Sequence, residues 1–274
     1  MTADSSLTNA DAVELAFRGE QLYGDDFDEE QIEQWFADEA EGYYNLGSDA
    51  AKAYGYHALN KRHGFSALGH QRFRHVLGVG SAYGEELSPI VPRCERITIL
   101  EPAPGFVATD IHGVSVDYVK PEASGDLPFD DETFDLITCL GVLHHIPNVS
   151  KVVGELFRCL APGGYALIRE PTTSMGDWRQ PRSGLTKRER GIPAHLLEDL
   201  VQSTGFRTVR KRRCTFSLTS RARYLVSGPV YNNASIVRLD ELVCSLPIWS
   251  RRYHARNALQ KLRAVSVFYV LQRP

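Results

Sequence analysis

The chain has 274 residues and a net charge of −3, with 43% hydrophobic and 24% charged residues. This length allows one large α/β domain, or a domain with a cap, and either can bury a full core. The N-terminal residues lack the basic start and continuous apolar run of a signal peptide, and no apolar run is long enough to cross a bilayer. We therefore expect a cytoplasmic protein without a membrane segment.

Charge is distributed unevenly along the chain. Residues 1–50 contain fourteen acids and one Arg, whereas residues 179–274 contain nineteen Lys or Arg and five acids. Two explanations stay open: a solvated, salt-bridged surface, or a site tuned to an anionic substrate.

The five cysteines are widely scattered, with no C-x-x-C pair that would indicate zinc or a redox centre, and no other metal motif is present. We expect them to be reduced and mostly structural. They are Cys94, Cys139, Cys159, Cys214 and Cys244.

The N-terminal part divides into two segments. Residues 1–27 show weak apolar spacing and many acids, which predicts a poorly packed lead-in. Residues 28–46 place apolar side chains at helical spacing after a plausible N-cap, so we expect an amphipathic helix. The apolar positions are Ile32, Trp35, Phe36 and Ala40.

Tyr43 and Tyr44 lie near the end of this segment, at the opening of whatever the helix covers. They are interpreted either as packing aromatics at the edge of a cap or as side chains over a ligand. A second helical pattern covers residues 50–62. We therefore predict a lead-in and helical cap over residues 1–70.

From residue 74 onward, apolar β-rich runs alternate with helical patterns. This alternation predicts an α/β fold with a doubly wound parallel sheet. The expected strands are residues 76–79, 97–100, 114–118, 134–140, 164–170, 206–214 and 264–271, and the expected helices are residues 84–88, 104–109, 150–160 and 193–203.

The stretch RHVLGVGSAYGEEL, residues 74–87, runs from an apolar strand through a glycine-spaced turn into helix-forming acids. Glycine is needed where the backbone approaches a ligand closely, and amides that open a helix attract anionic groups. Seventeen residues past Gly84, Glu101 ends a second β-rich run, where a carboxylate can accept from both hydroxyls of a ribose. The pattern predicts a site for an adenosine-bearing cofactor.

Four motifs in order extend this pattern: VLGVGSAYG, ILEP, GDLPFDDETFDLITCLGVLHHIPN and LFRCLAPGGYALIREP. They resemble the successive motifs of class I S-adenosylmethionine-dependent methyltransferases, in particular the ubiquinone/menaquinone-biosynthesis-like small-molecule branch. The resemblance covers residues 74–171. It implies a Rossmann-like sheet of seven strands, the last antiparallel, with the ligand at the carboxyl ends of the strands.

The resemblance implies a place for each part of S-adenosylmethionine. Gly80, Ala82 and Gly84 take the glycine-turn positions beside the methionine moiety, and Glu101 holds the ribose. Asp126, with Glu122 as second choice, receives the adenine amino group. The full expected cofactor set is Gly78, Gly80, Ser81, Ala82, Gly84, Glu101, Pro102, Asp126, Leu127, Leu140, Tyr43 and Tyr44.

Two positions depart from the family pattern. Gly78 stands where the family usually has an acid at the end of the first strand, and Ala82 replaces the second turn glycine. These departures leave open a degenerate, non-catalytic domain. A Rossmann dehydrogenase fits less well, because Tyr83 stands where its fingerprint needs a third glycine.

Methyl transfer needs the acceptor lone pair aligned behind the methyl carbon, and a hydroxyl acceptor also benefits from a base. His144 and His145 follow the fourth strand, and imidazole titrates near neutral pH, so both are candidate bases. The alternative is that they only shape the loop. Glu170, at the end of the fifth strand, is expected to orient a histidine or bind the acceptor.

Acceptor recognition is expected in the loop 171–193, which is basic and contains an aromatic. Arg forks suit phosphate or carboxylate, and an indole can stack on a ring. The expected acceptor-binding residues are Trp178, Arg179, Arg182 and Arg188, with Lys187 and Arg190 in the same loop. Residues 216–262 separate the last two strands and form an acceptor cap or an interface within the domain 71–274.

The sequence thus predicts a methyltransferase that acts on a polar small molecule, at an oxygen of a saccharide-like or anionic metabolite. Two other classes stay open, an RNA methyltransferase and a non-catalytic cofactor-binding regulator. A homodimer is also open.

Overall fold

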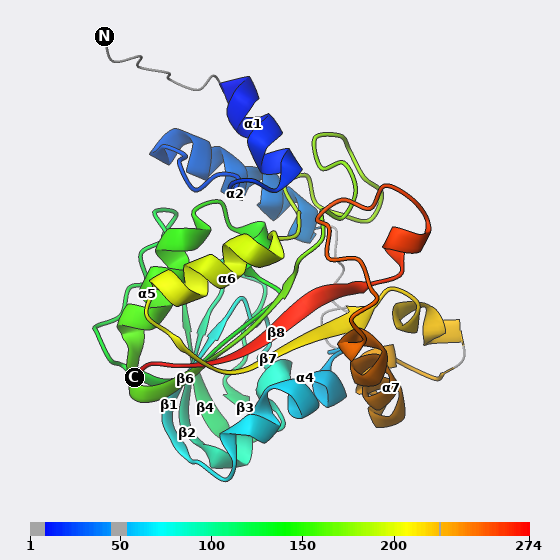
Figure 1. Cartoon of the computed structure of the whole chain (residues 1–274). Coiled ribbons are helices and arrows are strands. Elements are labelled where there is room, and N and C mark those ends of the chain that lie inside the picture. The colour runs from blue at the N-terminus through cyan, green and yellow to red at the C-terminus, as the bar shows by residue number, and fades with distance from the viewer. Residues whose placement is uncertain (1–8, 45–53, 225) are drawn as a thin grey trace.

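One sheet of eight strands organises the protein, whose computed structural model describes residues 9–44, 54–224 and 226–274. The strand order is β3-β4-β2-β1-β5-β6-β8-β7 (Figure 1). Strands β4, β2, β1, β5 and β6 are parallel, and β8 is antiparallel to both β6 and β7. The bounds are β1 Phe73–Val79, β2 Cys94–Leu100, β3 Asp110–Ile111, β4 Val114–Val119, β5 Phe134–Leu140, β6 Leu160–Pro171, β7 Arg207–Phe216 and β8 Ala264–Gln272.

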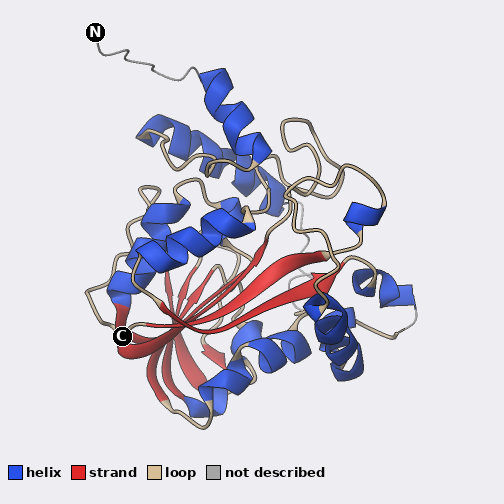
Figure 2. Ribbon diagram, in the orientation of Figure 1, coloured by secondary structure: helices blue, strands red, loops and turns tan. Residues whose placement is uncertain are grey.

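Helices cover both faces of the sheet (Figures 1 and 2). Helices α5 and α6 lie on one face, and α4 and α7 on the other. The α-helices are α1 Asn9–Arg18, α2 Glu29–Tyr44, α4 His57–His63, α5 Val149–Cys159, α6 Ala194–Ser203 and α7 Ala234–Ser245. Short 3₁₀ turns are η1 Phe65–Leu68, η2 Glu85–Leu87, η3 Val91–Arg93, η4 Leu143–His145, η5 Thr219–Tyr224, η6 Val230–Asn232 and η7 Leu259–Lys261.

Each face of the sheet has its own apolar core. Leu156 of α5 and Leu197 of α6 pack with Ile137 of β5 in one core. Leu59 of α4 and Val237 of α7 belong to the other. Because helices cover both faces, central strands such as β5 are apolar almost throughout, which made them easy to recognise in the sequence. The predicted doubly wound α/β fold with an antiparallel last strand is confirmed.

Two local predictions are wrong. The sheet has eight strands instead of seven, because the two-residue strand β3 pairs with the start of β4. Residues 104–109 form a turn instead of a helix, with the Phe106 amide donating to the Ala103 carbonyl at 3.3 Å. Pro104 and Gly105 are poor helix formers and leave too short a segment for a stable helix.

The prediction of a poorly packed lead-in is also wrong for residues 9–27. This segment contains α1, in which Ala16 is buried, and the Phe17 ring lies 5.7 Å from Trp178 and 4.3 Å from His254. Its packing partners lie more than 150 residues away in the chain, so local apolar spacing could not reveal them.

All five cysteines fall within the described residues, and all are buried free thiols, as expected. Across the described segments, no helix combines the length and the apolar character needed to cross a membrane.

Candidate functional site

The turn after β1 takes up a backbone that glycine favours. Gly80, Ala82 and Gly84 have φ of 60°, 47° and 72°. A Cβ on Gly80 would lie 2.8 Å from the methyl groups of Val142, and one on Gly84 would lie 2.2 Å from Ile111 Cδ1. Both positions therefore require glycine, because each lacks both the space and the backbone geometry for a side chain.

Ala82 holds its left-handed conformation although such a backbone costs an alanine about 1–2 kcal/mol. Its amide donates to Glu101 Oε2 at 3.0 Å, and its carbonyl accepts from the Tyr118 hydroxyl at 2.9 Å. These two bonds fix the turn, so the replacement of the family's glycine leaves the turn intact.

Glu101 lies directly beside this turn. It follows β2, whose residue Leu100 is in register with Val79 at the end of β1. Besides Ala82, the Ala103 amide donates to its carboxylate, at 3.1 Å. Burial raises the pKa of Glu101, against the effect of the two amide donors. The arrangement places a fixed hydrogen-bond acceptor at the carboxyl edge of the sheet.

A cavity of about 90 Å³ opens between the turn and the end of β5. Four predicted cofactor residues line it, namely Gly80, Ser81, Ala82 and Leu140. The other lining residues are Tyr54, Val79, Tyr83, Glu85 and Glu86. Pockets that enclose a whole cofactor measure roughly 300–1,000 Å³, so this cavity would take only one end of such a molecule.

The departure at Gly78 has a steric reason. A Cβ there would lie 2.4 Å from the Ser81 hydroxyl oxygen, so the missing acid could not be accommodated with Ser81 in place. A different acid, Glu86, lines the cavity and is only 5% exposed. Burial raises the pKa of Glu86 to about 7, and the charge of Glu101 adds to this effect. The cavity thus keeps a carboxyl group, supplied by η2 instead of β1.

A polar network lies behind the cavity. The Asn60 amide donates to the Tyr54 hydroxyl at 2.6 Å, and the Asn60 oxygen accepts from buried Arg169 at 3.0 Å. Arg169 also donates to the Leu140 carbonyl at 3.1 Å, and its guanidinium lies 3.9 Å from the centre of the Tyr56 ring. This network connects α4 to the carboxyl ends of β5 and β6.

The residues expected around adenine do not line this cavity. Asp126 is exposed and forms a 2.8 Å ion pair with Lys151, while Leu127 is buried and donates its amide to Glu155 at 3.0 Å. Pro102 is exposed beside Glu101. The adenine contact of Asp126 stays a prediction. The side chains of Tyr43 and Tyr44 lie outside the described residues.

His144 and Glu170 form a buried ion pair at the carboxyl edge. His144 Nδ1 lies 2.7 Å from Glu170 Oε2, and His144 Nε2 lies 3.7 Å from Glu189 Oε1. Although burial opposes it, the charge and hydrogen bond of Glu170 raise the pKa of His144 to about 9. The Glu170 carboxylate also accepts from the amides of Val142 and Leu143, both at 2.9 Å. This pair fixes the loop after β5, and a histidine that is already protonated fits poorly as a base.

His145 differs from His144 in its protonation. Its ring centre lies 4.1 Å from that of His144. Burial and the positive charge of His144 lower the pKa of His145, so the imidazole is neutral at pH 7. Its Nδ1 lies 2.7 Å from Glu39 Oε2, which ties this loop to α2. His145 therefore meets one requirement of a general base, which must be unprotonated before it accepts a proton.

Helix α2 binds the loop 171–193 as well as His145. Glu39 accepts from the Thr186 hydroxyl at 2.8 Å and from the Arg188 amide at 2.9 Å. Asp38 pairs with Lys187 at 2.8 Å and with Arg188 at 2.7 Å. Acids near the N-terminus thus neutralise part of the basic loop, which supports the salt-bridge explanation of the charge asymmetry for these residues.

The other basic side chains of the loop also bind groups of the chain itself. Arg179 pairs with Glu14 and Asp177, both at 2.9 Å. Arg182 donates to backbone carbonyls within the loop, and buried Arg190 donates to the carbonyls of His144 and Tyr23.

Trp178 is 7% exposed and stacks on Tyr23 with ring centres 4.7 Å apart. These contacts, with those of the loop arginines, give Trp178, Arg179, Arg182 and Arg188 structural roles. Their direct contact with an acceptor stays a prediction.

Ligand atoms of His144, His145 and Glu189 all lie within 4.8 Å of one another, a spacing that could hold a metal ion. The ion pairs of His144 with Glu170 and Glu189 already account for this grouping. We therefore assign it to the positioning of the loop.

Four residues of this site were not predicted from the sequence: Glu86, Tyr54, Glu39 and Asp38. Glu86 looked like one of two helix-forming acids after the turn, and no local signal separates the buried one from Glu85. Glu39 and Asp38 looked like the solvated face of an amphipathic helix, since their partners are about 150 residues further along the chain.

Comparisons with known proteins agree with this geometry. Residues 77–168 match the family model described as a methyltransferase domain. A phthiotriol/phenolphthiotriol dimycocerosates methyltransferase 1 of Mycobacterium ulcerans is 33% identical over 94 residues, which is 32% of this chain and 34% of the relative. The ubiquinone/menaquinone biosynthesis C-methyltransferase UbiE of Pseudoalteromonas translucida is 27% identical over 128 residues, 43% of this chain and 51% of the relative.

The alignments thus span about a third and about half of the length of these two relatives. Among solved structures, N-methyltransferase NodS of Bradyrhizobium japonicum, in complex with S-adenosyl-L-homocysteine, has a TM-score of 0.52 at 14% identity and covers 88% of this chain and 98% of its own. At that identity the likeness concerns the fold alone. The resemblance recognised from the motifs is confirmed over residues 77–168, which match the methyltransferase-domain model.

Proposed function

We propose that the chain transfers a methyl group from S-adenosylmethionine to a polar small molecule. The observation that carries this proposal is the hydrogen bond from the Ala82 amide to Glu101, which joins the glycine turn to the predicted ribose acceptor. Bound S-adenosylmethionine would supply an electrophilic methyl group. The matched methyltransferase domain and its named relatives support this activity, and their names favour a small molecule over RNA.

The cavity residues fit the zwitterionic methionine end of the cofactor. We assign the ammonium group to Glu86, because an ionised carboxylate in a nearly buried position binds a cation strongly. Glu101 would accept from the ribose hydroxyls, and Gly80 lets the backbone approach the ligand. In this arrangement the missing acid at Gly78 is replaced by Glu86.

The acceptor is proposed to present an oxygen, on a saccharide-like or anionic metabolite. The two relatives differ in the acceptors that their names give, so neither acceptor can be transferred to this chain. The cytoplasmic location and the homodimer likewise stay predictions.

Titration calorimetry with S-adenosylmethionine tests the cofactor assignment. We expect wild-type binding in the micromolar range and a loss of about tenfold to a hundredfold in Glu101→Ala, since a charge-assisted hydrogen bond contributes about 1.5–3 kcal/mol. Glu95→Ala removes an exposed acid of β2, the strand that precedes Glu101, and serves as the control. Absence of wild-type binding at millimolar cofactor would refute the proposed activity.

The acceptor base is tested at the two histidines. His145→Ala is expected to lower kcat by about 10²–10⁴-fold if His145 takes the acceptor proton. Because the pKa of His145 is lowered, wild-type turnover should stay high down to pH values below 6.5. A His145→Ala enzyme with full turnover across this pH range would exclude the role, and His144→Ala tests the other histidine in the same assay.

A further inference from the structure

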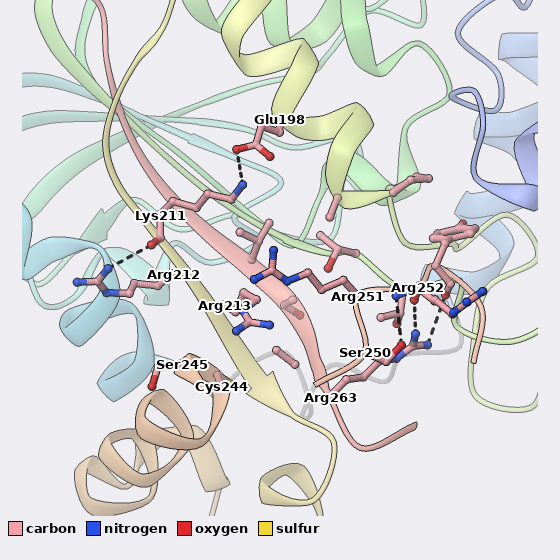
Figure 3. Close-up of a pocket in the computed structure, with 18 of the residues that line it drawn as sticks. Glu198, Lys211, Arg212, Arg213, Cys244, Ser245, Ser250, Arg251, Arg252 and Arg263 are labelled. Carbon is pink, nitrogen blue, oxygen red and sulfur yellow. Dashed lines mark hydrogen bonds and ion pairs between the residues drawn. The ribbon is translucent and has the colours of Figure 1, made fainter. Parts of the chain in front are cut away.

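A second cavity, of about 1,020 Å³, lies beside the outer edge of β7 and extends between α6 and α7 (Figure 3). The loop 250–253, the start of β8, residues 172–173 after β6, residues 18–19 at the end of α1 and Arg62 of α4 also line it. Its lining shares no residue with the cavity at the glycine turn. It is more than ten times larger than that cavity and falls in the size range of small-molecule sites.

Positive charge dominates the lining, with nine Arg or Lys against two Glu. Both glutamates are already paired: Glu198 with Lys211 at 2.6 Å, and Glu241 with Arg62 and Arg212. Five arginines have no carboxylate partner among the residues that the structure describes. They are Arg213, Arg238, Arg251, Arg252 and Arg263.

Arg213 and Arg251 approach each other from different elements, one from β7 and one from the loop 250–253 (Figure 3). The pKa of Arg213 is lowered, first by burial and then by the positive charge of Arg251. Bringing two like charges together in a partly desolvated place costs free energy. An anion bound between the two guanidinium groups would attract both of them and offset this repulsion.

A buried arginine, Arg263, holds one wall of the cavity in place. Arg263 is 7% exposed and donates to the backbone carbonyls of Arg252 and Tyr253. The loop that carries Arg251 is therefore held to the start of β8. These bonds fix the backbone of this loop at the cavity wall, so a ligand would not have to order that backbone.

Basic side chains on an edge strand also prevent pairing with other chains. That explanation covers Lys211 and Arg213 of β7. It does not explain why Arg238 of α7 and Arg251 and Arg252 of the loop face the same cavity. Convergence from three elements favours a ligand.

We propose that this cavity binds a small molecule with two or more phosphate groups. Guanidinium forks bind phosphate oxygens in pairs, and arginines spread over the cavity can contact several phosphates at once. The site is independent of the cofactor cavity, so its binding does not depend on the proposed methyl transfer.

Calorimetry with inorganic tripolyphosphate at physiological salt tests the proposal in the full chain. The wild-type chain should bind in the micromolar range, and R213Q/R251Q should weaken binding at least tenfold. R251Q alone should weaken it severalfold, and because no described contact depends on the Arg251 side chain, this variant should fold normally. The control R72Q/R74Q removes the same charge from two exposed arginines near the start of β1 and should bind as the wild type does.

Two results would overturn the proposal. One is the absence of tripolyphosphate binding at millimolar concentration. The other is equal weakening in R72Q/R74Q and R213Q/R251Q, together with tighter binding of a 20-nucleotide RNA, which would mark a general nucleic-acid surface whose affinity follows net charge.

Discussion

Glu170→Ala is expected to lower the free energy of unfolding by about 3–5 kcal/mol, the cost of removing one partner of a buried ion pair. The substitution would leave the buried imidazolium of His144 without its carboxylate at 2.7 Å. It would also remove the acceptor for the amides of Val142 and Leu143. Urea denaturation at pH 7 measures the difference, and Glu95→Ala, an exposed substitution, should stay within about 0.5 kcal/mol of the wild type.

The pH dependence of stability shows whether the charges of His144 and Glu170, and not only their packing, stabilise the fold. The folded pKa of His144 is raised to about 9, so its contribution is fully present below pH 6.5 and is lost as the pH rises through 9. The pKa of Glu170 is lowered, so its contribution is lost only when the pH falls into the acid range. Wild-type stability should therefore fall between pH 6.5 and 9, and Glu170→Ala should show a flatter profile. Equal profiles would mean that no such pair forms.

Glu86→Gln is expected to weaken S-adenosylmethionine binding about tenfold to a hundredfold at pH 8. The amide keeps the shape of the side chain and removes the charge that we assign to the cofactor ammonium. Because burial raises the pKa of Glu86 to about 7, the carboxyl group is mostly protonated at pH 6 and mostly ionised at pH 8. Wild-type affinity should therefore rise by about tenfold from pH 6 to pH 8.

The control is the same titration on Glu86→Gln, in which this rise should disappear. Glu95→Gln should keep it, since Glu95 is exposed on β2. A wild-type affinity that does not change between pH 6 and pH 8, or a Glu86→Gln chain that binds like the wild type, would remove Glu86 from the cofactor site. The proposed methyl transfer would survive that result, because it depends on Glu101 and the glycine turn.

Local sequence patterns were sufficient to predict most strands of the sheet and the glycine turn. The central strands β1, β2 and β5 are short, mostly apolar runs, because helices bury both faces, and such runs can be read without knowing their neighbours. The glycine positions were likewise readable, since a left-handed backbone at Gly80 and Gly84 excludes most other residues. The order of the strands then placed Glu101 and Glu170 at one edge.

Only the tertiary structure decided what the charged side chains do. Asp38 and Arg188 belong to segments about 150 residues apart, and their ion pair holds the predicted acceptor loop against α2. Glu86 and Glu85 are indistinguishable in sequence, but only Glu86 is buried in the fold, and that burial raises its pKa to about 7. The sequence by itself determined the fold and the cofactor turn, because backbone geometry and apolar periodicity are local. The roles of the ionisable groups depend on desolvation and on partners distant in the chain, which only the folded protein brings together.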